Sequence, residues 1–478
     1  MKSERSIRSI KSTRSLRSSL KGHSGKLVTE IIDLEAVLPV SCAKFNCPYI
    51  ILVKKTQQND DYYRALKNLD GTKKRISMAQ SAKQESVHSI RADDQESTSA
   101  DGLSTHINSL TVTSVYDTFN CLTGIYINEV AHLPRILMQV MRYLVPHYKN
   151  ITTVSITNCK LEASILYELS KIITVSTVVH VHLDGTSVAE ANYAILLDTA
   201  HLKSLTLSRC GINDNVCGIL ASRLYLSATG EKLSLLNLSS NHITDVGAKS
   251  LAEALRTNRC LRYLNIADNH ITDDGATSIL NVLMEFPLTS NEVLNKRKRF
   301  ITYLRRKNEM YLKYLADVTS VEMCKPAKRK KTSVTSVKSR SSARKEKETH
   351  QQQQSMCTDD SIRAKMLTQQ LMGPFLDPFQ SDCLKIHDGT TNCLGNMALA
   401  YLNMSYNDLS FMTIQTLRNV VDYQKCLKLV GYQTGLLKIV VDGNNMPIRC
   451  REMMFISEVL SGKNQEVVKR RKASKICA

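Results

Sequence analysis

A segment of 23 residues occurs twice in this chain, and the repetition constrains the fold more than any other feature. Leu233–Leu255 reads LSLLNLSSNHITDVGAKSLAEAL, and Leu261–Leu283 reads LRYLNIADNHITDDGATSILNVL. The matching residues Asn241 and Asn269 are 28 positions apart. Self-similarity at a fixed period of roughly 20–50 residues is the signature of stacked repeats. We therefore expect a solenoid in which each repeat buries its apolar face against its neighbours.

Looser copies of the same unit flank this pair. They begin at Leu122, Ile151, Val178 and Leu202 upstream, and at Leu399 and Leu436 downstream. The position of the repeated Asn is then held by Val130, Cys159, Thr186, Cys210, Asn407 and Asn444. An Asn side chain bonds the backbone of the turn that follows a strand, and Cys or Thr does this less well. The outer repeats are therefore expected to be less regular than the central pair.

The spacing within each unit has a physical reason. Alternate apolar residues on a short strand point to one side, so they enter the core while their neighbours face out. The T-D-x-G segment then opens an amphipathic helix, and either Thr244 or Asp245 can cap its free N–H groups. The residues expected in the core are Leu205, Leu207, Leu236, Leu238, Leu264 and Ile266. The unit resembles a leucine-rich repeat of the ribonuclease-inhibitor-like subtype. That likeness implies an α/β solenoid with parallel strands on the concave side and helices on the convex side.

The order of segments resembles one family more closely, the leucine-rich repeat-containing protein 71 family. The array is followed by a charged helix, TSNEVLNKRKR, and by a basic low-complexity insert, after which a final repeat pair resumes as LAYLNMSYNDL and GLLKIVVDGNNM. The resemblance covers roughly residues 111–450, and at the level of single residues it is specific only in the central repeats. It implies no catalytic residues. It also implies an association with ciliated cells.

Composition divides the chain into folded blocks and polar connections. Repeat blocks are expected at 111–287 and 381–460, with a basic amphipathic helix, opened by the capping box Thr289–Glu292, at 288–318. The other segments are a disordered basic Arg/Ser arm at 1–26, a candidate docking segment at 27–54, a disordered segment at 55–110, a disordered basic and Gln-rich linker at 319–380, and a basic tail at 461–478. The helix either packs on the end of the array, which we favour, or binds a partner. The second block is expected to join the same sheet, because two repeats are too few to be stable alone.

The excess of basic charge is concentrated in two segments. The chain carries a formal net charge of +20. Residues 1–26 contain eight Lys/Arg and one acid, and residues 296–348 contain eighteen Lys/Arg and five acids, which together account for the whole excess. The Arg/Ser-rich start also resembles a transit peptide, but its apolar residues share no helical face, so we favour a disordered arm. The candidate residues for electrostatic attachment are Lys328, Arg329, Lys330 and Lys331. That run is alternatively a nuclear-import signal, a phosphate-binding patch or an ordinary basic linker.

The sequence motifs favour binding over catalysis. The chain has none of the phosphate-binding, zinc-protease, nucleophile-elbow or EF-hand motifs, and its 14 Cys include no CxxC pair. We therefore predict no catalytic, cofactor or metal residues. Without a secretory signal, the Cys residues are expected to be reduced thiols. No run approaches the roughly 18 apolar residues that a membrane span needs, so no membrane partner is predicted.

Repeat arrays bind through the concave strand surface, and the outward column between the two inner strand positions is the candidate site. The candidate protein-binding residues are Ser155, His182, Thr206, Asn237, Asn265 and Asn403 in this column, with Tyr263 and Tyr401 beside it. The same column contains Tyr126 and Val440, and it holds no Lys or Arg, which a nucleic-acid groove would place there. Alternatively, Asn237, Asn265 and Asn403 simply form a hydrogen-bonded ladder.

Three functional hypotheses follow. The first is a non-enzymatic scaffold, cytoplasmic and in cilia or axonemes, that binds an unidentified protein and attaches through its basic arms to an acidic surface such as tubulin tails. The second is a nuclear or nucleic-acid-associated adaptor. The third is a small-GTPase regulator, since a Ran-activating family shares this repeat subtype, although that family ends in an acidic tail and this chain ends KRRKASKICA. We rank them in that order.

Overall fold

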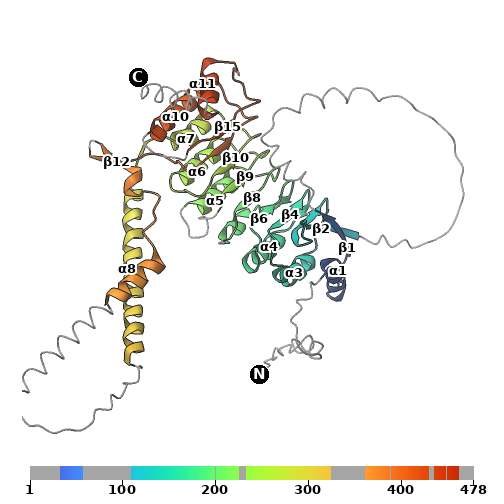
Figure 1. The fold of residues 1–478 in the computed structure, drawn as a ribbon. Helices are drawn as coiled ribbons and strands as arrows, with labels where there is room; N and C mark the ends of the chain where they lie inside the picture. Colours follow the sequence, from blue (N-terminus) through green and yellow to red (C-terminus); the bar gives the residue numbers. More distant parts are fainter. Residues whose placement is uncertain are drawn as a thin grey trace, which may run out of the picture.

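The protein is described from a computed structural model, in which residues 33–57, 109–199, 201–225, 233–323, 361–387, 389–429, 435–447 and 449–461 are placed. The array runs from the N-terminal helix α1 to the C-terminal helix α11, with strands along one side and helices along the other (Figure 1). One long helix, α8, projects away from it. The predicted run 328–331 and the arm 1–26 lie outside the described residues.

Within the described residues, one ten-stranded sheet runs through the whole array. Its strands, in spatial order, are β1 (Ile50–Gln57), β2 (Ser109–Tyr116), β3 (Leu122–Asn128), β4 (Thr153–Thr157), β6 (His180–His182), β8 (Ser204–Thr206), β9 (Leu235–Asn237), β10 (Tyr263–Asn265), β14 (Tyr401–Asn403) and β15 (Lys438–Val440). β2 and β3 are antiparallel, and the other neighbours are parallel. The solvent-facing side of this sheet is called the concave face below.

The helices follow the strands in alternation, as the repeat predicts. They are α1 (Leu34–Lys44), α3 (Arg135–Leu144), the 3₁₀ turn η1 (Val145–His147), α4 (Ala163–Val175), the 3₁₀ helix η2 (Tyr193–Asp198), α5 (Asp214–Leu224), α6 (Asp245–Leu255), α7 (Asp273–Asn281), α8 (Ser290–Met323), α10 (Phe411–Leu429) and α11 (Arg451–Leu460). The shortest repeat, 24 residues from Thr186 to Cys210, has η2 in place of an α-helix. A 3₁₀ helix spans the same distance with fewer residues.

All six predicted core residues are fully buried, which confirms the inward and outward alternation of the strands. Their strands β8, β9 and β10 pair in register, so that Leu205, Leu236 and Leu264 stack from one repeat to the next. Burying a Leu side chain contributes roughly 1.5–3 kcal/mol. The apolar interior is thus one continuous core that extends from repeat to repeat.

The repeated Asn residues tie each turn to the neighbouring turn. Asn241 Oδ1 accepts hydrogen bonds from the backbone N–H groups of Cys210 and Ile212, both at 3.0 Å, and its Nδ2 donates to the carbonyl of Leu207 at 2.9 Å. The side chains of Asn269, Asn407 and Asn444 likewise accept hydrogen bonds from backbone N–H groups of the preceding repeat. Cys210 at the equivalent position instead donates its thiol hydrogen to the Leu183 carbonyl at 3.0 Å. Cys210 thus keeps a bond to the preceding repeat but makes fewer of them than Asn241 does.

In each repeat, the residue just before the position of the repeated Asn has a left-handed backbone conformation. The residues with positive φ at this point are Glu129, Asn158, Gly185, Arg209, Ser240, Asp268, Tyr406 and Gly443. Most are not glycine, although a positive φ strains residues that carry a Cβ. The bonds of the following Asn, Cys or Thr to the turn compensate for this strain. Because the sequence shows no consistent glycine there, this feature of the turn is invisible in the repeat pattern.

The N-terminal end of the array is formed by segments that the repeat pattern does not predict. β1 pairs in parallel with β2 along its whole length, from Ile50–Ser109 to Gln57–Tyr116. α1 is held by Glu35, whose carboxylate accepts hydrogen bonds from the hydroxyls of Ser114 and Tyr116. Residues 55–57 and 109–110 therefore belong to strands, and the prediction of disorder across 55–110 is wrong at both ends.

The C-terminal repeats continue the same sheet, as predicted. β14 pairs with β10 in register, Tyr263 opposite Tyr401 and Asn265 opposite Asn403, although the two strands are more than a hundred residues apart in sequence. A three-stranded antiparallel sheet lies at the junction, formed by β11 (Phe286–Pro287), β13 (Thr390–Cys393) and β12 (Leu384–His387), with the 3₁₀ turn η4 (Ser381–Cys383) before it. A smaller pair joins β5 (Lys160–Leu161) to β7 (Ser187–Val188). The residues between β10 and β14 thus contain an insertion between two neighbouring strands of the sheet.

The projecting helix α8 differs from the prediction in length and in packing. It extends to Met323, and its first turn is fixed to the array by the capping box of Thr289 and Glu292, with Glu292 bound by Arg256 at 2.7 Å and 2.8 Å. A second helix, at 361–372, folds back beside it. The prediction of disorder across 319–380 is therefore wrong for 319–323 and for 361–380. Beyond its first turn, α8 also does not pack along the array.

Candidate protein-binding face

The structure aligns the outward column of the repeats in one row. Backbone pairing places Tyr126, Ser155, His182, Thr206, Asn237, Asn265, Asn403 and Val440 in register across eight strands. We call this set the central row. A flanking row, two residues earlier in each strand, contains Thr153, His180, Ser204, Leu235, Tyr263, Tyr401 and Lys438. Together the two rows form the surface of the concave face.

The central row is less accessible than its outward direction suggests. Ser155, Thr206 and Asn265 are buried, whereas His182, Asn237 and Asn403 are partly exposed. Neighbouring strands are only about 4.8 Å apart, so side chains of modest size in one row cover one another. A partner approaching this face therefore meets only part of the predicted set.

The three Asn residues of the central row have a local structural role. The Oδ1 atoms of Asn237, Asn265 and Asn403 accept hydrogen bonds from the backbone N–H two residues further on, each at 3.1 Å. Within the described part of the chain, no hydrogen bond joins these Asn side chains to one another, so the ladder alternative is wrong for this row. Each closes its own turn, and replacing one disturbs the turn as well as the surface.

His182 belongs to a small polar network. Its Nδ1 lies 3.0 Å from Thr206 Oγ1, and that hydroxyl donates to Asp184 Oδ2 at 3.0 Å. Because a hydroxyl has one hydrogen, His182 must donate its Nδ1–H to Thr206. Burial lowers the pKa of His182; Asp184 opposes this and His180 adds to it, and the net direction is down. The ring is therefore neutral at physiological pH and serves as a fixed donor in the network.

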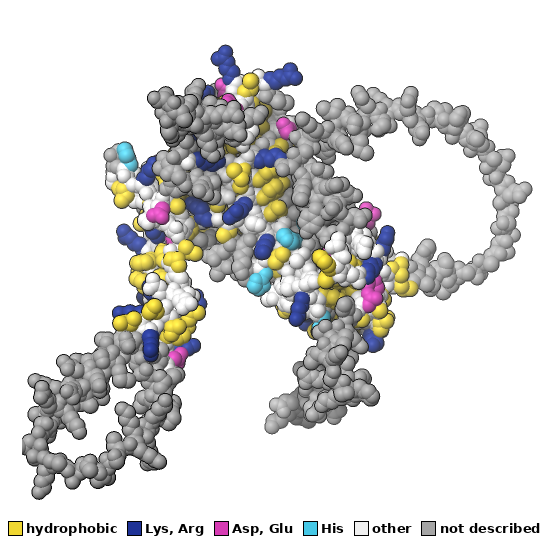
Figure 2. Space-filling model, in the orientation of Figure 1, with side chains coloured by type: hydrophobic (Ala, Val, Ile, Leu, Met, Phe, Trp, Pro, Cys, Tyr) yellow, Lys and Arg dark blue, Asp and Glu magenta, His cyan; other side chains and the backbone are white. Residues whose placement is uncertain are grey.

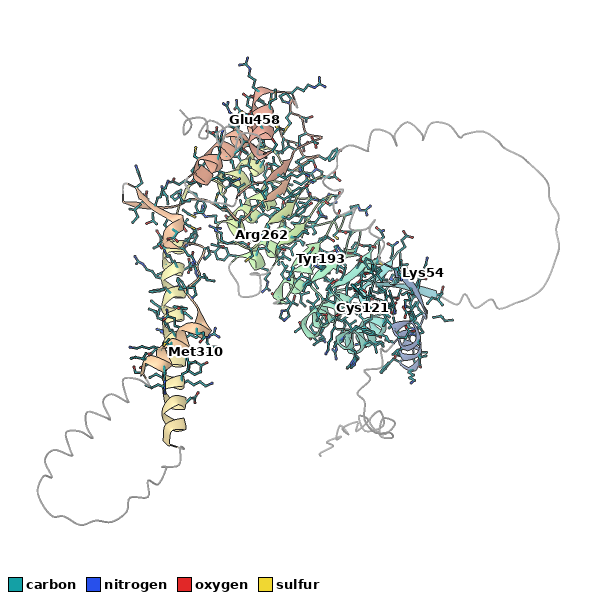
Figure 3. All side chains as sticks on the ribbon, in the orientation of Figure 1. Lys54, Cys121, Tyr193, Arg262, Met310 and Glu458 are labelled. Atoms are coloured by element: carbon teal, nitrogen blue, oxygen red, sulfur yellow. The ribbon has the colours of Figure 1, made fainter. Side chains whose placement is uncertain are left out.

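The most distinctive feature of the concave face is an aromatic pair. The rings of Tyr263 and Tyr401 stack with their centroids 4.1 Å apart and their planes 4° apart. Lys438 lies over the Tyr401 ring, 5.7 Å from its centroid. Arg262, labelled in Figure 3 near the middle of the array, is exposed and directly precedes Tyr263. Stacked tyrosines with neighbouring cations form an amphipathic surface that suits a protein interface.

The sequence prediction missed the charged side chains beside the central row. Lys203, Arg262 and Lys438 lie at the start of their strands, and Asp184 and Asp442 follow the ends of theirs. Reading every position of the aligned strands, rather than one column, would have found them. The strands of the concave face therefore have basic residues at one end and acidic residues at the other, which the uncharged central row alone does not show.

The described residues contain neither a metal-binding cluster nor a membrane-spanning helix. No group of three or more His, Cys, Asp or Glu side chains among them is arranged to hold a metal ion. His242 and His270 are stacked, with ring centroids 5.9 Å apart, and their recurrence follows the repeat. None of the helices in the described part of the chain combines the length and apolar character of a membrane span.

The fold and the concave face define a protein of the leucine-rich-repeat type. Residues 86–272 match the family model described as the PRAME C-terminal domain. Among solved structures, an internalin from Listeria monocytogenes is similar, with 11% sequence identity over 72% of this chain and 70% of that chain and a TM-score of 0.25. A search of curated proteins found no significant match.

Proposed function

We propose that this protein is a non-enzymatic scaffold that binds another protein on its concave face. The observation that carries the proposal is the stacked pair Tyr263 and Tyr401, with Arg262 and Lys438 beside it, on a continuous sheet. Rigid aromatic rings supply contact area at low entropic cost, and Tyr and Arg are enriched among the residues that dominate protein interfaces. The partner is expected to bring carboxylates to the edge formed by Lys203, Arg262 and Lys438.

The finer assignment rests on the order of segments. We propose that this chain is a member of the leucine-rich repeat-containing protein 71 family. The reason is that, in this chain as in that family, two repeat blocks flank a charged helix and a basic insert. Cytoplasmic and ciliary or axonemal localisation then follows from the family. The basic segments 1–26 and 296–348 are proposed to attach to an acidic surface such as tubulin tails. Their charge supports this, since many weak screened contacts add up across one chain.

A pair of matched variants tests the concave face. Tyr263→Ser with Tyr401→Ser removes the aromatic pair, and Val246→Ser with Met412→Ser removes two exposed apolar side chains from helices on the opposite side of the array. Tagged full-length proteins are compared by quantitative capture from extracts of ciliated cells. Loss of a defined set of partners from the tyrosine variant alone supports the proposal. Equal partner sets in all three proteins would place the binding surface elsewhere.

A further inference from the structure

Helix α8 carries a line of large apolar side chains that remains open to solvent. Leu294, Ile301, Leu304 and Leu312 are exposed by 48%, 49%, 45% and 54%. At 3.6 residues per turn these four lie within an arc of roughly 80° and extend over about 27 Å of helix. Hydrophobic side chains are visible along this projecting part of the molecule, interspersed with Lys and Arg (Figure 2). Contiguous exposed apolar surface of this kind marks an interaction site.

A different side of α8 is already occupied by the segment 361–379. Phe300 packs edge-on against Phe375, with ring centroids 5.2 Å apart, and the Tyr303 hydroxyl donates to the Gly373 carbonyl at 2.9 Å. Arg299 binds the buried Asp377 carboxylate at 2.6 Å and 3.1 Å. These contacts fix the returning segment on α8 and leave the apolar line uncovered. The helix is thus held in place by one face and open on another.

The rim of the apolar line is basic. Arg297, Lys298 and Arg305 are exposed on or beside the arc, and no carboxylate among the described residues is paired with them. Of the acids on the helix, Glu292 is bound by Arg256, and the exposed Glu309, four residues after Arg305, leaves the rim with a net positive charge. A second copy of the chain would bring the same positive rim. The chain's own basic segments, 1–26 and 463–478, carry net charges of +7 and +5 and are repelled in the same way.

We propose that this line is a docking site for an acidic amphipathic helix of another protein. Four apolar anchors at helical spacing suit a helix laid along α8, whose own apolar residues would cover them. Acidic residues flanking the partner's apolar face would then lie against Arg297, Lys298 and Arg305. The site lies on the projecting helix, apart from the concave face, so it is independent of the binding proposed for that face. It shares only its basic rim with the acidic attachment proposed for residues 296–348.

The test uses the full-length chain and defined peptides. The probe is a labelled synthetic helix of about 20 residues with Leu along one face and Glu beside it. Its controls are a scrambled peptide of the same composition and a version with Lys in place of Glu. The expected result by fluorescence anisotropy is binding of the Glu peptide at least about tenfold tighter than either control.

Three double variants locate the site. Ile301→Ser with Leu304→Ser removes apolar anchors, Arg297→Glu with Arg305→Glu reverses the rim, and Arg306→Glu with Lys313→Glu reverses exposed charges on the opposite side of the same helix. The first two are expected to weaken binding by about tenfold, and the third by less than about twofold. Circular dichroism confirms that each variant keeps the helical content of the parent.

Other occupants give distinct results. Equal weakening by all three variants would mean diffuse electrostatic attraction and would overturn the proposal. Sedimentation as a dimer that the Ile301→Ser, Leu304→Ser variant converts to a monomer would assign the line to a second copy. Binding to vesicles containing phosphatidylserine, lost in the same variant while the Glu peptide does not bind, would assign it to a lipid surface. Either result would replace the acidic helix.

Discussion

The carboxylate of Asp214 on α5 accepts hydrogen bonds from the backbone N–H of Thr244 at 2.8 Å and from its hydroxyl at 2.6 Å. Thr244 begins helix α6 of the next repeat, so one residue caps the helix of its neighbour. The same carboxylate accepts from the Gly247 N–H at 2.9 Å, and a Cβ at Gly247 would come within 2.7 Å of it. The T-D-x-G segment therefore supplies both a cap for its own helix, through Thr244, and a joint to the following repeat, through Asp245.

The first prediction concerns this joint. Asp245 binds the N–H groups of Thr272 and Gly275 at 2.8 Å and 3.0 Å, and Asp245→Ala leaves both without their acceptor. We expect a loss of about 1–2 kcal/mol in the free energy of unfolding, the usual size for a helix cap. The matched control is Asp274→Ala, an exposed acid in the first turn of α7. Urea unfolding of both variants checks the prediction, and equal losses would contradict it.

The second prediction is a pH dependence at the joint between the two repeat blocks. Burial raises the pKa of Asp273, but hydrogen bonds donated by Ser410 and Thr413 outweigh this and hold it below its ordinary value of 3.8. A carboxyl with a lowered pKa in the folded state contributes stability above its unfolded pKa and loses it as the pH falls through the folded value. Asp273→Asn should therefore flatten the decline of stability below about pH 4. Parallel thermal melts from pH 7, above the titration, down to about pH 2, below the unfolded pKa, measure the difference. If the parent and the variant decline in parallel, Asp273 is not the titrating group.

The third prediction concerns the core. Leu236 is fully buried between Leu205 and Leu264 of the neighbouring strands. Leu236→Ala removes buried methyl groups and leaves a cavity, which costs about 2–5 kcal/mol. The exposed Leu437 provides the control, since Leu437→Ala should change the free energy of unfolding by less than about 0.5 kcal/mol. Urea denaturation of both variants makes the comparison, and a small effect at Leu236 would be inconsistent with the inward register.

The repeat period predicted the strands, the inward leucines and the return of the second block, because these depend on residues within one unit. The pairing of β1 with β2 could not be predicted in the same way, since each paired residue lies 59 positions from its partner, as Ile50 does from Ser109, with no repeat between them. Asp245 accepts a hydrogen bond from Thr272 of the next repeat, a contact that forms only when both repeats are folded. A single copy of the motif therefore could not show whether the Thr or the Asp caps the helix.

The candidate site shows the same limit. The sequence placed Tyr263 and Tyr401 beside the outward column as candidate contacts, and in the structure their rings are stacked. That column could not show that the Asn237 side chain accepts a hydrogen bond from the backbone of its own turn. An outward polar residue has the same sequence pattern whether or not its side chain is bound to the backbone. Composition also could not distinguish the helix at 361–372 from the basic linker, because this helix is held in place by contacts of its segment with α8.

The fourth prediction tests how α8 is anchored. Glu292 accepts from the Thr289 N–H at 2.8 Å and from Arg256 at two points, so it closes the capping box and the ion pair together. Glu292→Gln keeps the size of the side chain but removes the charge, and hydrogen bonds to charged groups contribute about 1.5–3 kcal/mol. Hydrogen exchange in the first turns of α8 should therefore become faster. Glu309→Gln, an exposed acid on the same helix, should leave that exchange unchanged, and no difference between the variants would contradict the anchoring role.

The fifth prediction is that cutting the insert leaves the two repeat blocks together. Asn407 donates to the Ile266 carbonyl at 3.0 Å, Asn396 donates to the Leu255 carbonyl at 2.8 Å, and β14 pairs with β10. These contacts cross the insert, and closing a long loop costs only about 0.6 kcal/mol more for each doubling of its length. A site for a specific protease placed between residues 335 and 345 should therefore give two fragments that co-elute on gel filtration under native conditions. Asp273→Ala with Asn407→Ala removes side-chain bonds at the junction and should weaken the association of the cleaved fragments, while the strand pairing and the Arg299–Asp377 contact still join them. The uncleaved variant should still elute as one chain. Separation of the parent fragments would show that the covalent link, rather than the shared sheet, holds the second block in place.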